Sequence, residues 1–150
     1  MPAILIVAHA PLASALARVA AHTYPECSQQ LWALDIASGE TPEQVEARVR
    51  EAMHTQAAVD TLILTDIVGA TPHMGAWRVA EGNTHVNVVA GINVPMLWRT
   101  LCYRAEPLEK LVSRATDGGR LGVVQMAATR PANQGAANRN HAQDHDQDQQ

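Results

Sequence analysis

Short apolar runs recur along the chain at intervals of roughly thirty residues, and polar segments separate them. The first of these runs, residues 3–8, is continuously apolar, which is typical of a strand that is covered on both faces, as in the centre of a parallel sheet. On this pattern we predict strands over residues 3–8, 31–36, 61–65, 85–90 and 121–126.

Between these runs, apolar residues return every three or four positions, which is the spacing of one helix face. Leu12, Leu16 and Val19 show this spacing first. We predict helices over residues 12–22, 41–54, 71–82, 91–104 and 108–117. Thr71 is expected to cap its helix, and Gly118 with Gly119 is expected to end the last one.

Strands that alternate with helices predict an α/β fold in three layers, with a mainly parallel, twisted sheet and helices on both of its faces. The length of 150 residues and the hydrophobic fraction of 47% suit one domain. We assign residues 1–127 to that domain. Residues 128–150 are almost entirely polar, and a segment of this composition is expected to be a disordered tail.

Composition excludes several classes of protein. A net charge of -4, with Lys110 as the single lysine, argues against a nucleic-acid-binding surface. No apolar run reaches the roughly 18 residues of a membrane-spanning helix, and the start lacks a signal peptide, so we expect a cytoplasmic protein without membrane insertion. Cys27 and Cys102 stand far apart, which favours reduced thiols.

Ionisable side chains follow two of the predicted strands directly. His9 comes after residues 3–8, and Asp66 comes after residues 61–65. Side chains beyond the carboxyl ends of parallel strands line the crevice where ligands bind, so we expect His9 and Asp66 to meet there. A neutral imidazole nitrogen is a nucleophile near physiological pH, and a carboxylate can orient the ring. The hypothesis is therefore that His9 accepts a phosphoryl group and Asp66 orients it.

The segment after Asp66 can bind such a group. Val68, Gly69, Ala70 and Thr71 lead into a helix whose first N–H groups are free to bind an anion. This chemistry requires no metal ion and no organic cofactor. Each residue also has an ordinary interpretation: a solvated loop histidine, a turn-forming aspartate and a common helix start. Their convergence favours the functional interpretation.

The remaining histidines are weaker candidates. We expect His73 to be a solvated surface residue, and the histidines near predicted element ends, His22, His54 and His85, to be exposed. His141 and His145 in the polar tail are spaced as weak metal ligands, but a disordered segment lacks a preformed site. Signatures of zinc proteases, α/β-hydrolases, P-loop NTPases and dinucleotide enzymes are absent from the sequence.

Three segments, in order, resemble the mannose-type enzyme IIA domains of the bacterial phosphoenolpyruvate:sugar phosphotransferase system. Residues 4–13, ILIVAHAPLA, resemble the strand that ends in the family's phosphoacceptor histidine. Residues 64–72, LTDIVGATP, resemble the loop with its supporting aspartate, and residues 89–97, VAGINVPML, resemble the distinctive Gly-x-Asn-x-Pro-Met-Leu segment. The resemblance extends from Met1 to about Ala127.

This resemblance implies that the first and third strands are neighbours, with His9 as phosphoacceptor and Asp66 as its support. It implies a phosphocarrier that receives a phosphoryl group from phospho-HPr and passes it to a IIB protein in trans. It also implies a homodimer in which an antiparallel C-terminal edge strand, residues 121–126, is swapped between subunits. The role would lie in sugar uptake or in a regulatory phosphorelay.

The chain departs from the family's pattern at several positions. Ala10 replaces a glycine after the histidine, Val68 stands where an aromatic residue is frequent, and Ala70 replaces a second glycine. His73 and Met74 replace the usual residues after Pro72. These changes leave open a degenerate, non-phosphorylated dimeric binding module. The phosphocarrier domain of the dihydroxyacetone kinase system, and a metal-independent hydrolase that uses His9 and Asp66, are further alternatives.

Overall fold

The structure, a computed structural model, describes residues 1–28, 30–56 and 58–126. Its centre is a four-stranded sheet in the order β2-β1-β3-β4. The strands are β1 (Ala3–His9), β2 (Leu31–Ile36), β3 (Thr61–Thr65) and β4 (Val86–Ala90). All neighbouring strands run parallel. The predicted α/β fold with a parallel sheet is confirmed, and so is the expected adjacency of the first and third strands.

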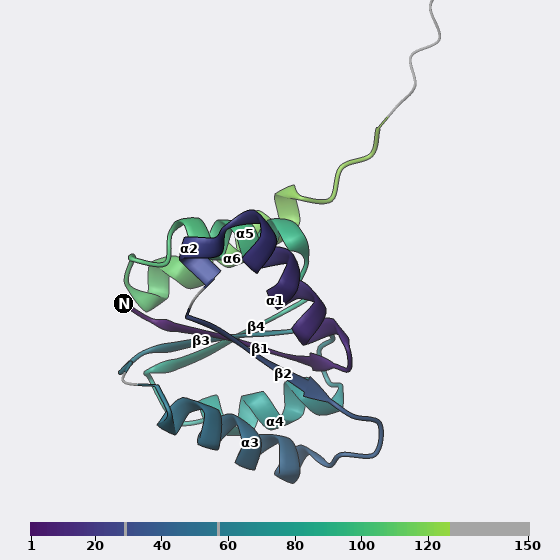
Figure 1. The fold of residues 1–150 in the computed structure, drawn as a ribbon. Coiled ribbons are helices and arrows are strands. Elements are labelled where there is room, and N and C mark those ends of the chain that lie inside the picture. The colour runs from purple at the N-terminus through teal and green to yellow at the C-terminus, as the bar shows by residue number, and fades with distance from the viewer. Residues whose placement is uncertain (29, 57, 127–150) are drawn as a thin grey trace, which may run out of the picture.

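Helices cover both faces of this sheet (Figure 1). One layer holds α1 (Leu12–Thr23), α2 (Pro25–Ser28), α5 (Val94–Cys102) and α6 (Leu108–Leu121). The other layer holds α3 (Pro42–His54) and α4 (Thr71–Ala80). The described helices and strands therefore form the predicted three-layer arrangement.

Two hydrophobic clusters, one on each face of the sheet, hold the layers together. Ile4, Ile6 and Ala8 of β1 belong to the cluster beneath α1, α5 and α6. Leu5 and Val7 belong to the cluster above α3 and α4. Successive strand residues project to opposite faces, so a central strand must be apolar at every position. This requirement explains the continuous apolar run that begins the sequence and leaves His9 as the one exposed residue of β1.

The C-terminal part of the fold differs from two predictions. Helix α6 does not end at Gly118 and Gly119 but continues through them to Leu121. The predicted strand over residues 121–126 is not formed within a single chain, because Leu121 is helical and residues 123–126 have no regular structure. A strand that these residues form with a second subunit stays a prediction. Both glycines lie against α5, where a Cβ on Gly118 would approach Arg99 Cβ to 2.6 Å. Close packing between α5 and α6 thus requires glycine inside the helix, and it overrides the low helical propensity of this residue.

Smaller differences concern single residues and the boundaries. The N-cap of α4 is Ala70, and Thr71 is the first helical residue and makes no capping hydrogen bond. The short helix α2 lies between the predicted helix 12–22 and the predicted strand 31–36, in a segment for which no helix was predicted. None of the helices in the described ranges is long and apolar enough to cross a membrane. The expected disordered tail, 128–150, lies outside the described residues, as does residue 127.

The contact between α5 and α6 leads to a prediction about stability. Gly118→Ala is expected to lower the free energy of unfolding by about 1–3 kcal/mol, because the new methyl group would collide with Arg99 Cβ and approach the Pro95 carbonyl oxygen. Urea unfolding followed by circular dichroism measures this change. Asp117→Ala, at an exposed neighbouring position on α6, is the control and should shift stability by no more than about 0.5 kcal/mol. A Gly118→Ala protein as stable as wild type would contradict the packing argument.

Candidate functional site

His9 and Asp66 lie side by side at the carboxyl edge of the sheet. His9 is the last residue of β1, and Asp66 follows β3 directly; these strands are paired with Val7 opposite Thr65. Oδ2 of Asp66 accepts a hydrogen bond from the backbone N–H of His9 at 2.9 Å and lies 2.7 Å from Nδ1 of the same residue. One carboxylate oxygen therefore fixes both the backbone and the ring of His9.

The second oxygen of this carboxylate is also bound. Asp66 Oδ1 accepts a hydrogen bond from the backbone N–H of Ile67 at 2.8 Å. Burial by itself would raise the pKa of Asp66, but the hydrogen bonds from the His9 backbone, the His9 ring and the Ile67 backbone together lower this pKa below its ordinary value of 3.8. The carboxylate is consequently ionised at neutral pH.

An ionised carboxylate at Nδ1 determines which nitrogen of His9 carries the hydrogen. The neutral ring donates its Nδ1–H to Asp66, so the lone pair that can act as a nucleophile resides on Nε2. The side chain of His9 is 49% exposed, whereas that of Asp66 is 8% exposed. The arrangement thus presents a nucleophilic nitrogen at the surface and keeps its orienting partner beneath it.

Backbone hydrogen bonds brace the segment that carries Asp66. The carbonyl oxygens of Thr65 and Asp66 accept bonds from Ile92 N at 2.9 Å and Gly91 N at 2.8 Å. The loop between β4 and α5 is thereby tied to the end of β3. Gly91 has a φ of 86°, a left-handed conformation that favours glycine at this point. Gly91 and Ile92, from the third sequence motif (residues 89–97), therefore support the backbone around Asp66.

Helix N-termini at this edge of the sheet differ in what occupies them. The N-terminus of α1 is closed by Asp35, whose Oδ1 accepts from Ser14 N at 3.0 Å. The side chain of Thr41 caps α3, and that of Asn93 caps α5. In contrast, the N-cap of α4, Ala70, offers no side-chain acceptor. Among the helices described at this edge, α4 is the one whose first N–H groups remain open to an anion.

The predicted anion-binding residues form the turn between Asp66 and α4. Val68 is 74% exposed, Gly69 has a φ of 81°, and Ala70 N donates to the Ile67 carbonyl oxygen at 3.2 Å. Thr71 is half-buried at the first position of α4. The turn therefore runs from the carboxylate that holds His9 to the open helix N-terminus.

Two residues at this edge have contacts that sequence analysis did not anticipate. Asp35 accepts a hydrogen bond from the first turn of α1. The signal in the sequence was a carboxylate near the end of a predicted strand, where helix N-termini of a parallel sheet gather. His73 was expected to be solvated, but it is half-buried and its Nδ1 lies 3.1 Å from the hydroxyl oxygen of Thr65. A histidine one turn into a helix gives no sequence signal of such a contact, because its partner lies on another element.

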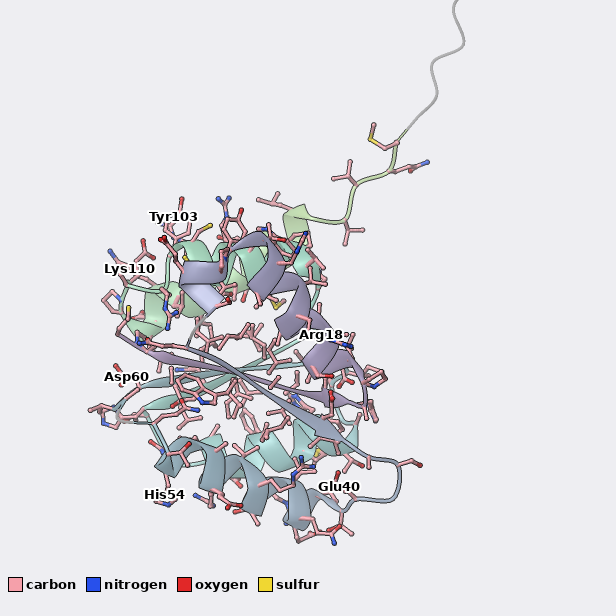
Figure 2. The ribbon with its side chains drawn as sticks, viewed as in Figure 1. Arg18, Glu40, His54, Asp60, Tyr103 and Lys110 are labelled. Atoms are coloured by element: carbon pink, nitrogen blue, oxygen red, sulfur yellow. The ribbon has the colours of Figure 1, made fainter. Side chains whose placement is uncertain are left out.

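A second histidine–aspartate pair offers a comparison within the molecule. His85 Nδ1 lies 2.8 Å from Asp60 Oδ1, but the side chains are 59% and 40% exposed. Asp60 precedes β3 and lies at the opposite end of the sheet from Glu40, which precedes α3 near the site edge (Figure 2). A short histidine–carboxylate contact therefore does not by itself define the site, which also needs a buried carboxylate and the neighbouring helix N-terminus.

Other sequence candidates lie away from the site or outside the described residues. His22 and His54 are exposed, as predicted, and so is His85. Among residues 1–28, 30–56 and 58–126, no group of three or more histidine, cysteine, aspartate or glutamate residues lies close enough to hold a metal ion. The two tail histidines that were considered as weak ligands, His141 and His145, lie outside the described residues.

The lowered pKa of Asp66 predicts a contribution to acid stability. Because this pKa lies below the unfolded value of 3.8, the native state binds fewer protons, and its stabilisation is present above that pH and is lost as the pH falls through the folded-state pKa. In Asp66→Asn, the free energy of unfolding should fall less steeply with decreasing pH below about 4 than in wild type. Urea unfolding at a series of pH values tests this. An equal slope in wild type and Asp66→Asn would refute the coupling.

Comparison with known proteins identifies the family of this chain. A sequence profile described as the PTS system fructose IIA component, of the mannose-type IIA family, matches residues 3–115. The PTS system mannose-specific EIIAB component of Escherichia coli (strain K12) is 32% identical over 143 residues. That alignment covers 87% of this chain but 43% of the relative, so the chain spans less than half the length of this relative.

Solved structures share the fold. The mannose/sorbose-specific IIA subunit of Enterococcus faecalis superposes with a TM-score of 0.78 at 19% identity, over 87% of this chain and 98% of that one. The EIIA component of Streptococcus agalactiae gives a TM-score of 0.75 at 21% identity, over 83% and 97% of the two chains. With a family profile that matches most of the chain, these likenesses lead to one conclusion: the chain belongs to the mannose-type enzyme IIA family of the sugar phosphotransferase system.

Proposed function

We propose that this protein is a phosphohistidine carrier, which accepts a phosphoryl group on Nε2 of His9 and passes it on. The observation that carries the proposal is the double hold of Asp66 on His9, through the backbone N–H and Nδ1, which leaves Nε2 as the reactive nitrogen. Phospho-HPr is the proposed donor and a IIB protein in trans the proposed acceptor, in the cytoplasm. This assignment follows from membership of the family and the geometry of the site.

The proposed transfer is a displacement between two imidazole rings. The lone pair on His9 Nε2 attacks phosphorus as the phosphorus–nitrogen bond to the donor's phosphohistidine breaks, and the donor ring leaves with that electron pair as neutral imidazole. His9 then bears hydrogen on Nδ1 and the phosphoryl group on Nε2, so its ring carries the positive charge that the donor ring has lost. Asp66 stabilises this charge without taking the proton. Transfer onward to the acceptor reverses these roles.

The negative phosphoryl oxygens need hydrogen-bond donors, and the turn before α4 supplies them. Val68, Gly69, Ala70 and Thr71 form this turn, and the open N-terminus of α4 adds the positive end of the helix dipole. The hydroxyl group of Thr71 is free of a capping bond and can donate as well. Catalysis would rest on positioning and on charge stabilisation, with no metal ion or organic cofactor.

The surface around His9 bears on the choice of partner. Ile67 and Val68, directly after Asp66, are 62% and 74% exposed. Exposed apolar side chains beside a reactive nitrogen favour a protein partner that docks on them, because docking removes their surface from water. An aromatic residue is frequent at the position of Val68 in the family, so we expect partner preference here to differ. The acceptor is to be sought among sugar-transport IIB proteins and regulatory targets.

The phosphocarrier proposal predicts a mass change. Incubation with phosphoenolpyruvate, enzyme I and HPr from the source organism should add one phosphoryl group to the wild-type protein, detected by intact mass at alkaline pH and lost in acid. His9→Gln should gain none. Asp66→Asn should react about a hundredfold more slowly, because the ring loses its charged orienting partner.

The second histidine–aspartate pair provides the matched control for this experiment. His85→Gln removes a histidine that also touches an aspartate, but at the other end of the sheet, and should be phosphorylated at the wild-type rate. Absence of phosphorylation in a folded wild-type protein would exclude the carrier. The exposed Ile67 and Val68 would then favour the alternative of a non-phosphorylated binding module.

We also propose that the protein is a homodimer joined through its C-terminal segment. Val123, Val124 and Met126 are 81%, 69% and 88% exposed, which is unusual for an apolar run. Strand β4 pairs only with β3 among the described strands, so its outer edge is open. Beside that edge lies a groove whose lining includes Trp77 and Val88. Residues 122–126 of a second copy, added as an antiparallel strand, would cover both apolar surfaces.

The dimer proposal predicts that a charged side chain in the C-terminal segment weakens the dimer. Wild type should elute as a dimer in size-exclusion chromatography with light scattering, and Val124→Lys should shift it toward monomer, because a charge would enter the apolar contact. Val59→Lys, at a position 74% exposed outside this segment, should remain dimeric. A monomeric wild-type protein would contradict the proposal.

A further inference from the structure

A second histidine is held at the same edge of the sheet. Nδ1 of His73, in the first turn of α4, lies 3.1 Å from the hydroxyl oxygen of Thr65 at the end of β3. Thr65 is fully buried. A buried hydroxyl group without a partner costs free energy, so this contact has a structural reason to persist.

The two histidines are held in the same way by consecutive residues. Asp66 binds Nδ1 of His9, and Thr65 binds Nδ1 of His73. Nδ1 is thereby engaged in both rings, and Nε2 is the remaining polar atom of each. No hydrogen-bond partner for Nε2 of His73 occurs among the residues that the structure describes. Its half-buried ring is thus fixed at one nitrogen and available at the other.

Both rings belong to the same side of the sheet. Residues two apart in a strand project to one face, and Val7 and Ile63 project into the cluster between the sheet and helices α3 and α4. His9, two residues after Val7, and Thr65, two residues after Ile63, continue along that face. His73 reaches Thr65 from α4, the helix whose open N-terminus adjoins this edge. His9 and His73 therefore belong to the same side of the sheet as the open N-terminus of α4.

We propose that His73 is a further phosphoryl-binding residue of this protein, whose Nε2–H donates a hydrogen bond to the phosphoryl group carried on His9. This inference rests on the proposed phosphocarrier function and adds a residue to it. In this proposal the Thr65 hydroxyl is the donor to Nδ1 of His73, so that the ring hydrogen is on Nε2. A neutral or a protonated ring can donate from that position. His73 is one of the positions at which the chain departs from the pattern of its family's loop.

The experiment uses two variants of His73, each of which keeps a polar group near the position of only one of the two ring nitrogens. In His73→Asn the side-chain amide lies near the position of Nδ1, which keeps a partner for Thr65 and removes Nε2. In His73→Gln the amide nitrogen reaches the position of Nε2. Full-length wild type, both variants and His85→Gln are charged with phosphoramidate or phospho-HPr, and intact mass at equilibrium with HPr gives the phosphorylated fraction.

We expect His73→Asn to lower the equilibrium constant for phosphorylation about tenfold, the usual effect of one hydrogen bond to a charged group. His73→Gln should recover most of this loss, and His85→Gln should match wild type. A purely structural role through Thr65 predicts the opposite order, with asparagine tolerated better than glutamine. In wild type, the ¹⁵N resonance of His73 Nε2 should shift on phosphorylation, and this shift should be absent in His9→Gln.

The outcomes separate the two proposals. If wild type accepts a phosphoryl group and both His73 variants equal it, or if asparagine is the better replacement, the role of His73 is refuted and the carrier function stands. If wild type accepts none from either donor, both proposals are overturned. Unfolding by urea, measured for every variant, identifies any loss that arises from misfolding.

Discussion

The candidate site depends on one carboxylate that is bound from several directions. Asp66 accepts hydrogen bonds from the backbone and ring of His9 and from the backbone of Ile67, and it is nearly buried. Burial alone would favour the neutral acid, whereas these bonds keep the carboxylate charged. A charged oxygen at Nδ1 sets the tautomer of His9 and leaves Nε2 reactive. The chemistry proposed for this protein therefore starts from the geometry of a single side chain.

The sheet fixes the position of this carboxylate relative to His9. Strands β1 and β3 are adjacent and parallel, so residues distant in sequence end at the same edge. Bonds from Gly91 and Ile92 to the carbonyl groups beside Asp66 hold that edge against the next loop. A site carried by paired strands varies less in geometry than one carried by free loops, which matters because phosphoryl transfer depends mainly on position and charge.

The helix N-termini at this edge differ in whether a side chain caps them, and this difference favours α4 as the place where an anion would bind. Asp35, Thr41 and Asn93 fill the starts of α1, α3 and α5, and each satisfies N–H groups that an anion would otherwise bind. Helix α4 begins at Ala70 without such an acceptor. An arriving phosphoryl group would meet unsatisfied N–H groups at α4, on the side of the sheet to which His9 and His73 belong. The absence of one capping side chain is thus as informative as the presence of the others.

The sequence by itself determined the local elements and the strand ends. Continuous apolar runs fix strands such as β1, and the Thr41–Gln44 capping box fixes the start of α3, because these signals are contained within a few residues. The positions of His9 and Asp66 beyond their strands were readable for the same reason. Their meeting at one edge was expected because parallel strands end at the same edge. The adjacency of the first and third strands was expected only from the family resemblance, since periodicity does not specify strand order.

Only the tertiary structure decided the features that depend on contacts between distant segments. Gly118 and Gly119 continue α6 because α5 packs against them, although glycine locally favours a helix end. His73 is half-buried because Thr65, on another element, binds its ring, and Asp35 closes a helix that precedes it in sequence. Such contacts leave no periodic signal in the chain, because the free energy that fixes each of them arises only when the separate elements have packed together.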